Sequence, residues 1–217
     1  VAEYGQPGEI FRSADLTRDG RYLVAGMATP DDVNHRTEVL DLTTGAVVTT
    51  FKPPSLYPTC TILHPDGHRV ISTYGRGNAY VWDLMTGKTV WQTDLLPDFN
   101  MRVPSAAAAV SPDGRTLAFT DKQLGIRLVN ADTYADIRRW NAHTDGIWSL
   151  SFSPDGRWLL SASEDQTVGV WDVATGSLVA RLTGHGAQVL CARMSPDGTR
   201  IATGGRDGLV RLWDVTH

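Results

Sequence analysis

The sequence lacks the features of a membrane-spanning or secreted chain. None of its 217 residues belongs to an apolar run long enough to cross a bilayer, and no basic segment followed by an apolar one stands at the N-terminus. It has only two cysteines, Cys60 and Cys191, which is too few for a disulfide framework and indicates a reducing compartment. We therefore expect a cytoplasmic protein that does not bind membranes. Because the chain begins with Val1 rather than Met, we also expect it to derive from a longer polypeptide.

Positive charge is also scarce. The 20 lysines and arginines are outnumbered by 24 aspartates and glutamates, which gives a net charge of −4 at pH 7. Proteins that bind nucleic acid usually present a basic face, so this balance argues against nucleic acid as a partner. The remaining composition, with 41% hydrophobic and 20% charged residues, is that of a globular chain able to bury a core.

One short turn motif is abundant. A tetrapeptide ending in Asp-Gly recurs five times, with its Asp at positions 19, 66, 113, 155 and 197, so that the steps are 47, 47, 42 and 42 residues. Four copies have Pro before the Asp. Pro presets φ at the first corner, Asp bonds its own backbone, and Gly supplies the positive φ that closes the turn. Five copies in phase predict a repeat fold.

A second motif follows each turn in phase. Three copies carry Trp-Asp, at Trp82, Trp171 and Trp213, and two degenerate copies carry Leu40 and Val129 at the same place. In four repeats this position lies 16 residues after the turn Asp, whereas the first repeat needs 21 because of an insertion around residues 29–36. Short apolar or alternating runs predict four strands in each repeat, such as those at 147–152, 158–161, 168–171 and 178–182.

Four short antiparallel strands repeated every 42 to 47 residues describe the blade of a β-propeller. We therefore predict an all-β fold and a single domain over residues 1–217. Its repeat units are approximately 5–51, 52–98, 99–140, 141–182 and 183–217. The fifth unit stops after its third strand, and residues 1–4 fit the end of a fourth strand that closes it. Two alternatives remain open, a closed five-bladed ring and part of a larger, usually seven-bladed ring.

With these motifs the sequence resembles the WD-repeat β-propeller family over essentially the whole chain, and most specifically in its last two repeats. The resemblance implies a structural hydrogen-bond chain from Trp to Ser or Thr, then to His and Asp, which we call the brace. Its members are His143, Ser161, Asp165 and Trp171 in the fourth repeat, and His185, Thr203, Asp207 and Trp213 in the fifth. Ser, His and Asp together also suggest a hydrolytic triad. A nucleophile is needed once, however, whereas this set recurs with a Trp in phase, so we predict no catalytic residue.

The first three repeats depart from the family pattern. The His position falls on Pro7, Pro54 and Met101, and the Asp position falls on Arg76 in the second repeat and Gln123 in the third. These blades cannot form the brace, so we expect them to depend on packing and to be the softer half of the molecule.

The resemblance also implies a docking face, because partners of this family commonly bind the loops between the fourth and first strands and between the second and third. Register places nine residues on that face: Arg12, Tyr57, Thr59, Lys122, Trp148, Glu164, Gln188, Leu190 and Arg206. Aromatic and arginine side chains amid mixed charge are typical of protein interfaces. The set contains no carboxylate or imidazole cluster suited to metal or acid–base chemistry, so we predict no metal and no cofactor.

We therefore predict a non-catalytic scaffold that docks other proteins or peptides, as the binding or sensing portion of a larger intracellular regulatory protein in signalling. The Ala-, Gly- and Arg-rich, Lys-poor composition indicates a bacterial source. An open ring would also self-associate or pair with missing blades, since bare strand edges and faces favour assembly. The alternative is a propeller enzyme, such as a lactonase-like or metal-dependent hydrolase.

Overall fold

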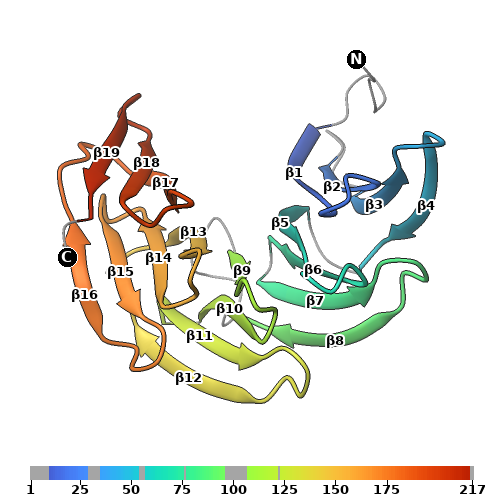
Figure 1. The fold of residues 1–217 in the computed structure, drawn as a ribbon, viewed down its shortest axis with the longest axis horizontal. Coiled ribbons are helices and arrows are strands. Elements are labelled where there is room, and N and C mark those ends of the chain that lie inside the picture. Colours follow the sequence, from blue (N-terminus) through green and yellow to red (C-terminus); the bar gives the residue numbers. More distant parts are fainter. Residues whose placement is uncertain are drawn as a thin grey trace. The chain divides into compact units, whose positions relative to one another are not determined.

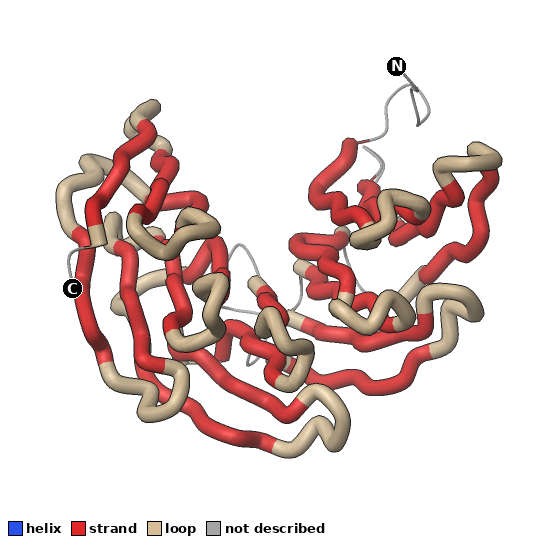
Figure 2. The backbone as a smooth tube through the Cα atoms, in the orientation of Figure 1, coloured by secondary structure: helices blue, strands red, loops and turns tan. Residues whose placement is uncertain are grey.

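The computed structural model describes residues 10–28, 35–53, 57–75, 77–95, 107–121 and 123–215. All regular structure in those residues is β-strand (Figure 2), as the sequence predicts. The strands form five antiparallel sheets (Figure 1), four with four strands and one with three. We call these sheets blades 1 to 5 in chain order. The chain divides into two compact units, Val1–Asp94 and Leu95–His217, which we call unit 1 and unit 2.

Unit 1 contains blades 1 and 2, each a meander in which consecutive strands are neighbours. The strands of blade 1 are β1 (Ile10–Leu16), β2 (Tyr22–Ala28), β3 (Arg36–Asp41) and β4 (Ala46–Phe51). Those of blade 2 are β5 (Pro58–Leu63), β6 (Arg69–Tyr74), β7 (Asn78–Asp83) and β8 (Thr89–Asp94). The two sheets meet where β1 and β2 pack on β5.

Unit 2 contains blades 3, 4 and 5 with the same meander order. Blade 3 has β9 (Ala108–Val110), β10 (Thr116–Asp121), β11 (Gly125–Asn130) and β12 (Asp136–Asn141). Blade 4 has β13 (Ile147–Phe152), β14 (Trp158–Ser163), β15 (Val168–Asp172) and β16 (Leu178–Leu182), which are the four strands predicted there with β14 and β15 slightly longer. Blade 5 has β17 (Val189–Met194), β18 (Arg200–Gly205) and β19 (Val210–Asp214), and no fourth strand within the described residues.

The recurring Asp-Gly turn joins the first two strands of each blade. In blade 4 the Gly156 amide donates to the Ser153 carbonyl at 2.9 Å, and Gly156 has φ of 73°, a conformation that Gly adopts without strain. The Asp155 carboxylate accepts hydrogen bonds from the Ser153 hydroxyl and from the Arg157 amide. The turns of blades 3 and 5 make the same bonds. The hairpin therefore closes on residues within the motif itself, which is why the motif is readable from sequence.

The apolar cores lie between neighbouring blades, where the faces of two sheets meet. In unit 1 the core between blades 1 and 2 is rich in aromatic side chains and consists of Val24, Val39, Phe51, Leu63, Val70, Tyr74, Tyr80, Trp82 and Leu84. In unit 2 one cluster joins blades 3 and 4, and a second joins blades 4 and 5. In blade 4 the inner strands β14 and β15 thus alternate their buried side chains between the two cores, as Leu159 lies in the cluster shared with blade 3 and Leu160 in the one shared with blade 5.

One face of blade 5 is uncovered within unit 2. On β19, Val210 and Leu212 are 76% and 68% exposed. One repeat earlier, the matching residues Val168 and Val170 of β15 are 1% and 6% exposed, because they lie in the core that blade 5 shares with blade 4. The same sheet face is therefore core in blade 4 and open in blade 5.

Candidate functional site

The four brace residues of blade 4 form one continuous hydrogen-bonded chain. Trp171 Nε1 donates to Ser161 Oγ at 2.8 Å, and His143 Nε2 lies 2.7 Å from the same hydroxyl. His143 Nδ1 lies 2.8 Å from Asp165 Oδ2. Because Ser161 accepts the indole proton, its own proton is free for His143, whose Nδ1–H then donates to the carboxylate. Ser161 is fully buried, so the chain gives partners to groups that water does not reach.

The Asp165 carboxylate is held in its ionised form. Burial alone would raise the pKa of Asp165, but hydrogen bonds from His143 and Thr167 outweigh burial and keep the pKa well below the ordinary Asp value. Thr167 Oγ1 donates to Asp165 Oδ1 at 2.7 Å. Arg181 on β16 then closes the outer side, donating from Nη1 to Thr167 Oγ1 at 3.0 Å. A buried hydroxyl inside so complete a network is a structural element and is not placed to attack a substrate.

Blade 5 repeats the brace with one added group. Trp213 Nε1 donates to Thr203 Oγ1 at 3.0 Å, and His185 bridges Thr203 and Asp207 at 2.8 and 3.0 Å. Arg211 on β19 donates from Nη1 to Asp207 Oδ2 at 2.7 Å. Burial opposes ionisation of Asp207, yet the Arg211 contact and the Gly186 and Leu209 amides keep its pKa well below the ordinary value. Sequence analysis missed Arg211 because the matching position in blade 4 is a glycine.

Blade 2 keeps half of the brace. Trp82 Nε1 donates to Ser72 Oγ at 3.1 Å, although the positions of His and Asp, Pro54 and Arg76, lie outside the described residues. An aromatic cluster, comprising Phe51, Tyr74, Tyr80 and Trp82, surrounds this bond. Phe51 stacks on Trp82 with ring centroids 5.0 Å apart, and the Tyr74 hydroxyl lies 3.0 Å from Thr37 Oγ1.

Blades 1 and 3 replace the polar brace with apolar side chains. At the register of Ser161, blade 1 has Ala25 and blade 3 has Phe119, both with no exposed surface. At the Trp register the corresponding residues are Leu40 and Val129, which are also buried. Because these side chains have no polar group, they leave no buried donor or acceptor that would require a His–Asp pair as a hydrogen-bond partner.

The predicted docking residues of unit 1 form a small patch, which we call the loop patch of unit 1. The Arg12 guanidinium lies over the Tyr57 ring, with Cζ 5.0 Å from the ring centroid. Gly75 makes room for that ring, because a Cβ at this position would come within 2.9 Å of Tyr57. Thr59 Oγ1 lies 2.9 Å from Thr73 Oγ1 on the neighbouring strand β6. The structure therefore brings Arg12 and Tyr57 together, and Thr59 follows two residues later on β5.

The predicted docking residues of unit 2 form a second patch, consisting of Trp148, Glu164, Gln188, Leu190 and Arg206, which we call the loop patch of unit 2. Arg206 Cζ lies 5.3 Å from the centroid of the Trp148 ring, so an arginine of blade 5 covers a tryptophan of blade 4. The Arg206 amide donates to the Gln188 carbonyl at 2.8 Å, and the Glu164 amide makes the matching bond to Gly146. Leu190 is 38% exposed. Lys122, the remaining predicted docking residue, lies outside the described residues.

Glu164 is the electrostatically unusual member of this patch. Its pKa is raised above the ordinary Glu value, first by burial and then by the negative charge of Asp145, while Arg206 and the Trp148 indole oppose the rise. No described basic side chain lies within ion-pairing distance of it. Sequence analysis did not find Asp145, which lies in the loop before β13, next to Gly146.

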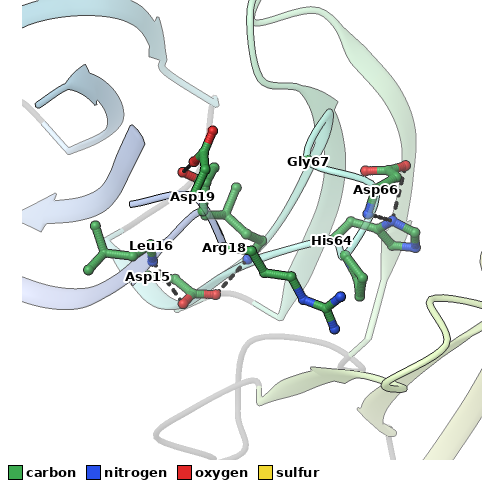
Figure 3. Close-up of a pocket in the computed structure, with 10 residues that line it drawn as sticks. Asp15, Leu16, Arg18, Asp19, His64, Asp66 and Gly67 are labelled. Carbon is green, nitrogen blue, oxygen red and sulfur yellow. Dashed lines mark hydrogen bonds and ion pairs between the residues drawn. The ribbon is translucent and has the colours of Figure 1, made fainter. Parts of the chain in front are cut away.

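A hollow of about 290 Å³ lies between the Asp-Gly turns of blades 1 and 2 (Figure 3). Asp15 links the two blades there, because its Oδ2 accepts the Leu63 amide at 2.8 Å. His64 lies beside Asp66, with Nδ1 3.0 Å from Oδ2, and Arg69 contacts both residues. A guanidinium against the imidazole disfavours a second cation, so the hollow does not have the character of a metal site.

No three His, Cys, Asp or Glu side chains of the described residues are arranged to hold a metal ion. No helix among those residues is long and apolar enough to cross a membrane.

Two segments of the chain, both in unit 2, match a known family of repeats. Residues 135–172 and 176–214 each match the model of the WD40 family, described as WD domain, G-beta repeat. Both matched segments contain a Trp of the brace. These two segments are therefore repeats of the WD40 family. No curated protein matches the chain. Domains of the family are commonly protein-interaction scaffolds and are generally non-catalytic, and the two matched repeats are those that carry the full brace.

Proposed function

We propose that this WD40-repeat chain is a non-catalytic scaffold that docks other proteins or peptides through its loop patches. The observation that carries the proposal is the arginine stacked on an aromatic ring in each patch, Arg12 on Tyr57 in unit 1 and Arg206 on Trp148 in unit 2. Trp, Tyr and Arg are enriched among the residues that contribute most of the binding energy in protein interfaces, and the aromatic rings offer a large, rigid contact area. Tyr57 and Arg206 lie in loops, while Arg12 and Trp148 lie at irregularities in the pairing of the first strands β1 and β13.

The wider setting of the proposal is a larger bacterial, cytoplasmic regulatory protein in which this chain is the binding or sensing portion for signalling. Two cysteines without a disulfide framework support a reducing compartment. The Arg-rich, Lys-poor composition supports the bacterial source. A net charge of −4 supports proteins rather than nucleic acid as partners.

Affinity capture with variants of one residue tests this choice of surface. The immobilised chain should retain a specific partner. The amount of partner recovered should change when the immobilised chain carries Trp148→Ala or Arg206→Ala. The matched control is Trp158→Ala in the same blade, since the Trp158 ring is also covered by an arginine, Arg157, at 4.4 Å. It lies beside the Asp-Gly turn rather than in the loop patch of unit 2. Equal recovery by Trp148→Ala and the unsubstituted chain would show that the wrong surface was chosen.

The non-catalytic part of the proposal has its own test. Metal analysis of the purified chain, together with a screen of ester and lactone substrates, should give neither stoichiometric metal nor turnover. Turnover that survives purification and is abolished by a chelator would favour a propeller hydrolase instead.

The bare face of blade 5 supports a second kind of contact, self-association or pairing with further blades. Val210 and Leu212 are exposed, while their counterparts in blade 4 are covered by another sheet. Large exposed apolar faces mark association surfaces. Light scattering at several concentrations should give a mass above that of one chain, and Leu212→Glu should reduce it to one chain. A single-chain mass at all concentrations would rule out self-association and leave pairing with further blades as the proposal.

A further inference from the structure

We propose that the loop patch of unit 2 binds a basic side chain, a lysine or an arginine, presented by a partner peptide. This inference rests on the docking function proposed above and adds the chemistry of the partner. Three observations in blades 4 and 5 support it, namely a ring that already holds a guanidinium, an excess of carboxylate, and a buried acceptor without a donor.

The first observation is the position of Arg206. Its guanidinium lies over the face of Trp148, with Cζ 5.3 Å from the ring centroid. Trp is the aromatic side chain that best attracts a cation through the negative charge of its face. Arg206 itself is exposed, so this cation is at the surface and can be exchanged for another one. The chain's own arginine therefore occupies the kind of position that a partner's cation would take.

The second observation is the charge around the ring. Two carboxylates, Glu164 and Asp145, are close enough to raise the pKa of Glu164, and only one guanidinium, Arg206, opposes them. Glu164 is half-buried and makes no ion pair with the described residues. A partly desolvated carboxylate without a counter-charge is unfavourable, and an added cation would relieve it.

The third observation is the hydrogen-bonding capacity of the patch. Gln188 Oε1 is buried and accepts no hydrogen bond from the described residues. Together with the two carboxylates, it makes the patch rich in acceptors. Ammonium and guanidinium groups carry only donors, so they complement such a set, whereas a carboxylate or phosphate would not.

Arg206 therefore acts as an internal competitor for the partner's cation. A bound basic side chain would form ion pairs with the carboxylates and displace the guanidinium from the ring. An acidic partner would instead form an ion pair with Arg206. The two chemistries make opposite predictions for Arg206→Ala, and this difference decides between them.

The test uses two fluorescently labelled, end-capped Gly/Ser peptides that differ only in carrying arginines or glutamates, with anisotropy as the readout at fixed salt. The arginine peptide should bind and the glutamate peptide should not. Glu164→Gln should weaken binding by about tenfold, since a charge-assisted contact is lost. Arg206→Ala should strengthen it by about threefold, since the competing cation over the ring is removed. Trp148→Ala should weaken it, and Trp158→Ala should leave it unchanged.

Asp132→Asn is the matched control for charge, because Asp132 is an exposed residue in a turn of blade 3 and its loss changes the net charge by the same amount as Glu164→Gln. Equal weakening by both variants would mean a diffuse attraction to an acidic protein and would overturn the inference. Binding of the glutamate peptide, or weaker binding by Arg206→Ala, would also overturn it. In those cases the scaffold proposal still stands if affinity capture depends on Trp148, whereas capture that is independent of Trp148 removes both.

Discussion

Blades 2 and 4 each bury a tryptophan on the third strand, yet they support it in different ways. In blade 4 the indole of Trp171 ends a polar chain through Ser161, His143 and Asp165, all of which belong to that blade. In blade 2 the indole of Trp82 bonds only Ser72 and is packed among aromatic rings. The first solution is local to one blade.

The second solution is shared between two blades. Phe51, which stacks on Trp82, is the last residue of β4 in blade 1, and Thr37, which meets the Tyr74 hydroxyl, is on β3 of the same blade. The tryptophan of blade 2 therefore depends on side chains of its neighbour, whereas Trp171 also contacts its neighbour through Trp140 but adds a hydrogen-bonded chain within its own blade. The difference teaches that loss of the His and Asp positions need not leave a blade soft, provided that ring contacts across the inter-blade face replace them.

The largest expected effect comes from removing the shared support. Trp82→Ala deletes a fully buried ring and its stacking partner contact, which we expect to cost about 3–5 kcal/mol of the free energy of unfolding. Because the cluster joins two blades, hydrogen exchange should increase in both β1–β4 and β5–β8. Val90→Ala, an exposed position on β8, is the control and should cost less than about 0.5 kcal/mol. Exchange that increases in blade 2 alone would contradict shared support.

The next effect comes from breaking the local support. His143→Ala leaves Ser161 and Asp165 without their common partner inside a buried network, at a cost of about 2–3 kcal/mol. Here the increase in hydrogen exchange should be confined to blade 4, beginning at the loop before β13. Denaturant titration gives the free energy, and exchange that spreads evenly through blades 3 to 5 would argue against a brace local to one blade.

The sequence could predict the local support but not the shared one. The Asp-Gly turns and the Trp positions recur at fixed spacing, so five repeats could be named from the chain alone, and the resemblance to the WD-repeat family named the members of both braces. The contact of Phe51 with Trp82 crosses from one repeat to the next and has no recurring motif. Arg181 and Arg211 reach the two brace carboxylates from different strands, β16 and β19, so no common position marks them either. Side chains that act across strands or blades are specified by three-dimensional packing, which periodicity does not encode.

A smaller expected effect is a difference between blades 4 and 2 in how their stability depends on pH. The pKa of Asp165 is lowered in the folded chain, so its contribution to stability is present above the unfolded pKa of about 3.9 and is lost as the pH falls below it. Burial raises the pKa of the Tyr74 phenol, so its contribution is present below the unfolded pKa of about 10 and is lost as the pH rises above it. Each such group changes stability by up to about 1.4 kcal/mol per pH unit in its own range.

Two variants isolate these limbs. Thermal unfolding against pH should show a flatter acid limb in Asp165→Asn and a flatter alkaline limb in Tyr74→Phe. Unit 1 also holds turn carboxylates of lowered pKa, such as Asp66 at about 2, so the comparison depends on the variants rather than on the shape of the unsubstituted curve. An acid limb unchanged by Asp165→Asn would show that protonation of this carboxylate does not lower stability, contrary to what its hydrogen bonds predict.

The smallest expected effect comes from the serine that accepts the indole hydrogen bond in each blade, Ser161 in blade 4 and Ser72 in blade 2. Ser161→Ala removes the acceptor of the Trp171 indole and also the partner of His143 Nε2, whereas Ser72→Ala removes the acceptor of the Trp82 indole and leaves the rings in place. We expect Ser161→Ala to cost about 1 kcal/mol more than Ser72→Ala, since it strands one additional buried polar atom. Denaturant titrations of the two variants measure this difference directly. Equal costs would mean that the polar chain in blade 4 stabilises the fold only through the hydrogen bond from Trp171 to Ser161. The two blades would then differ in packing alone.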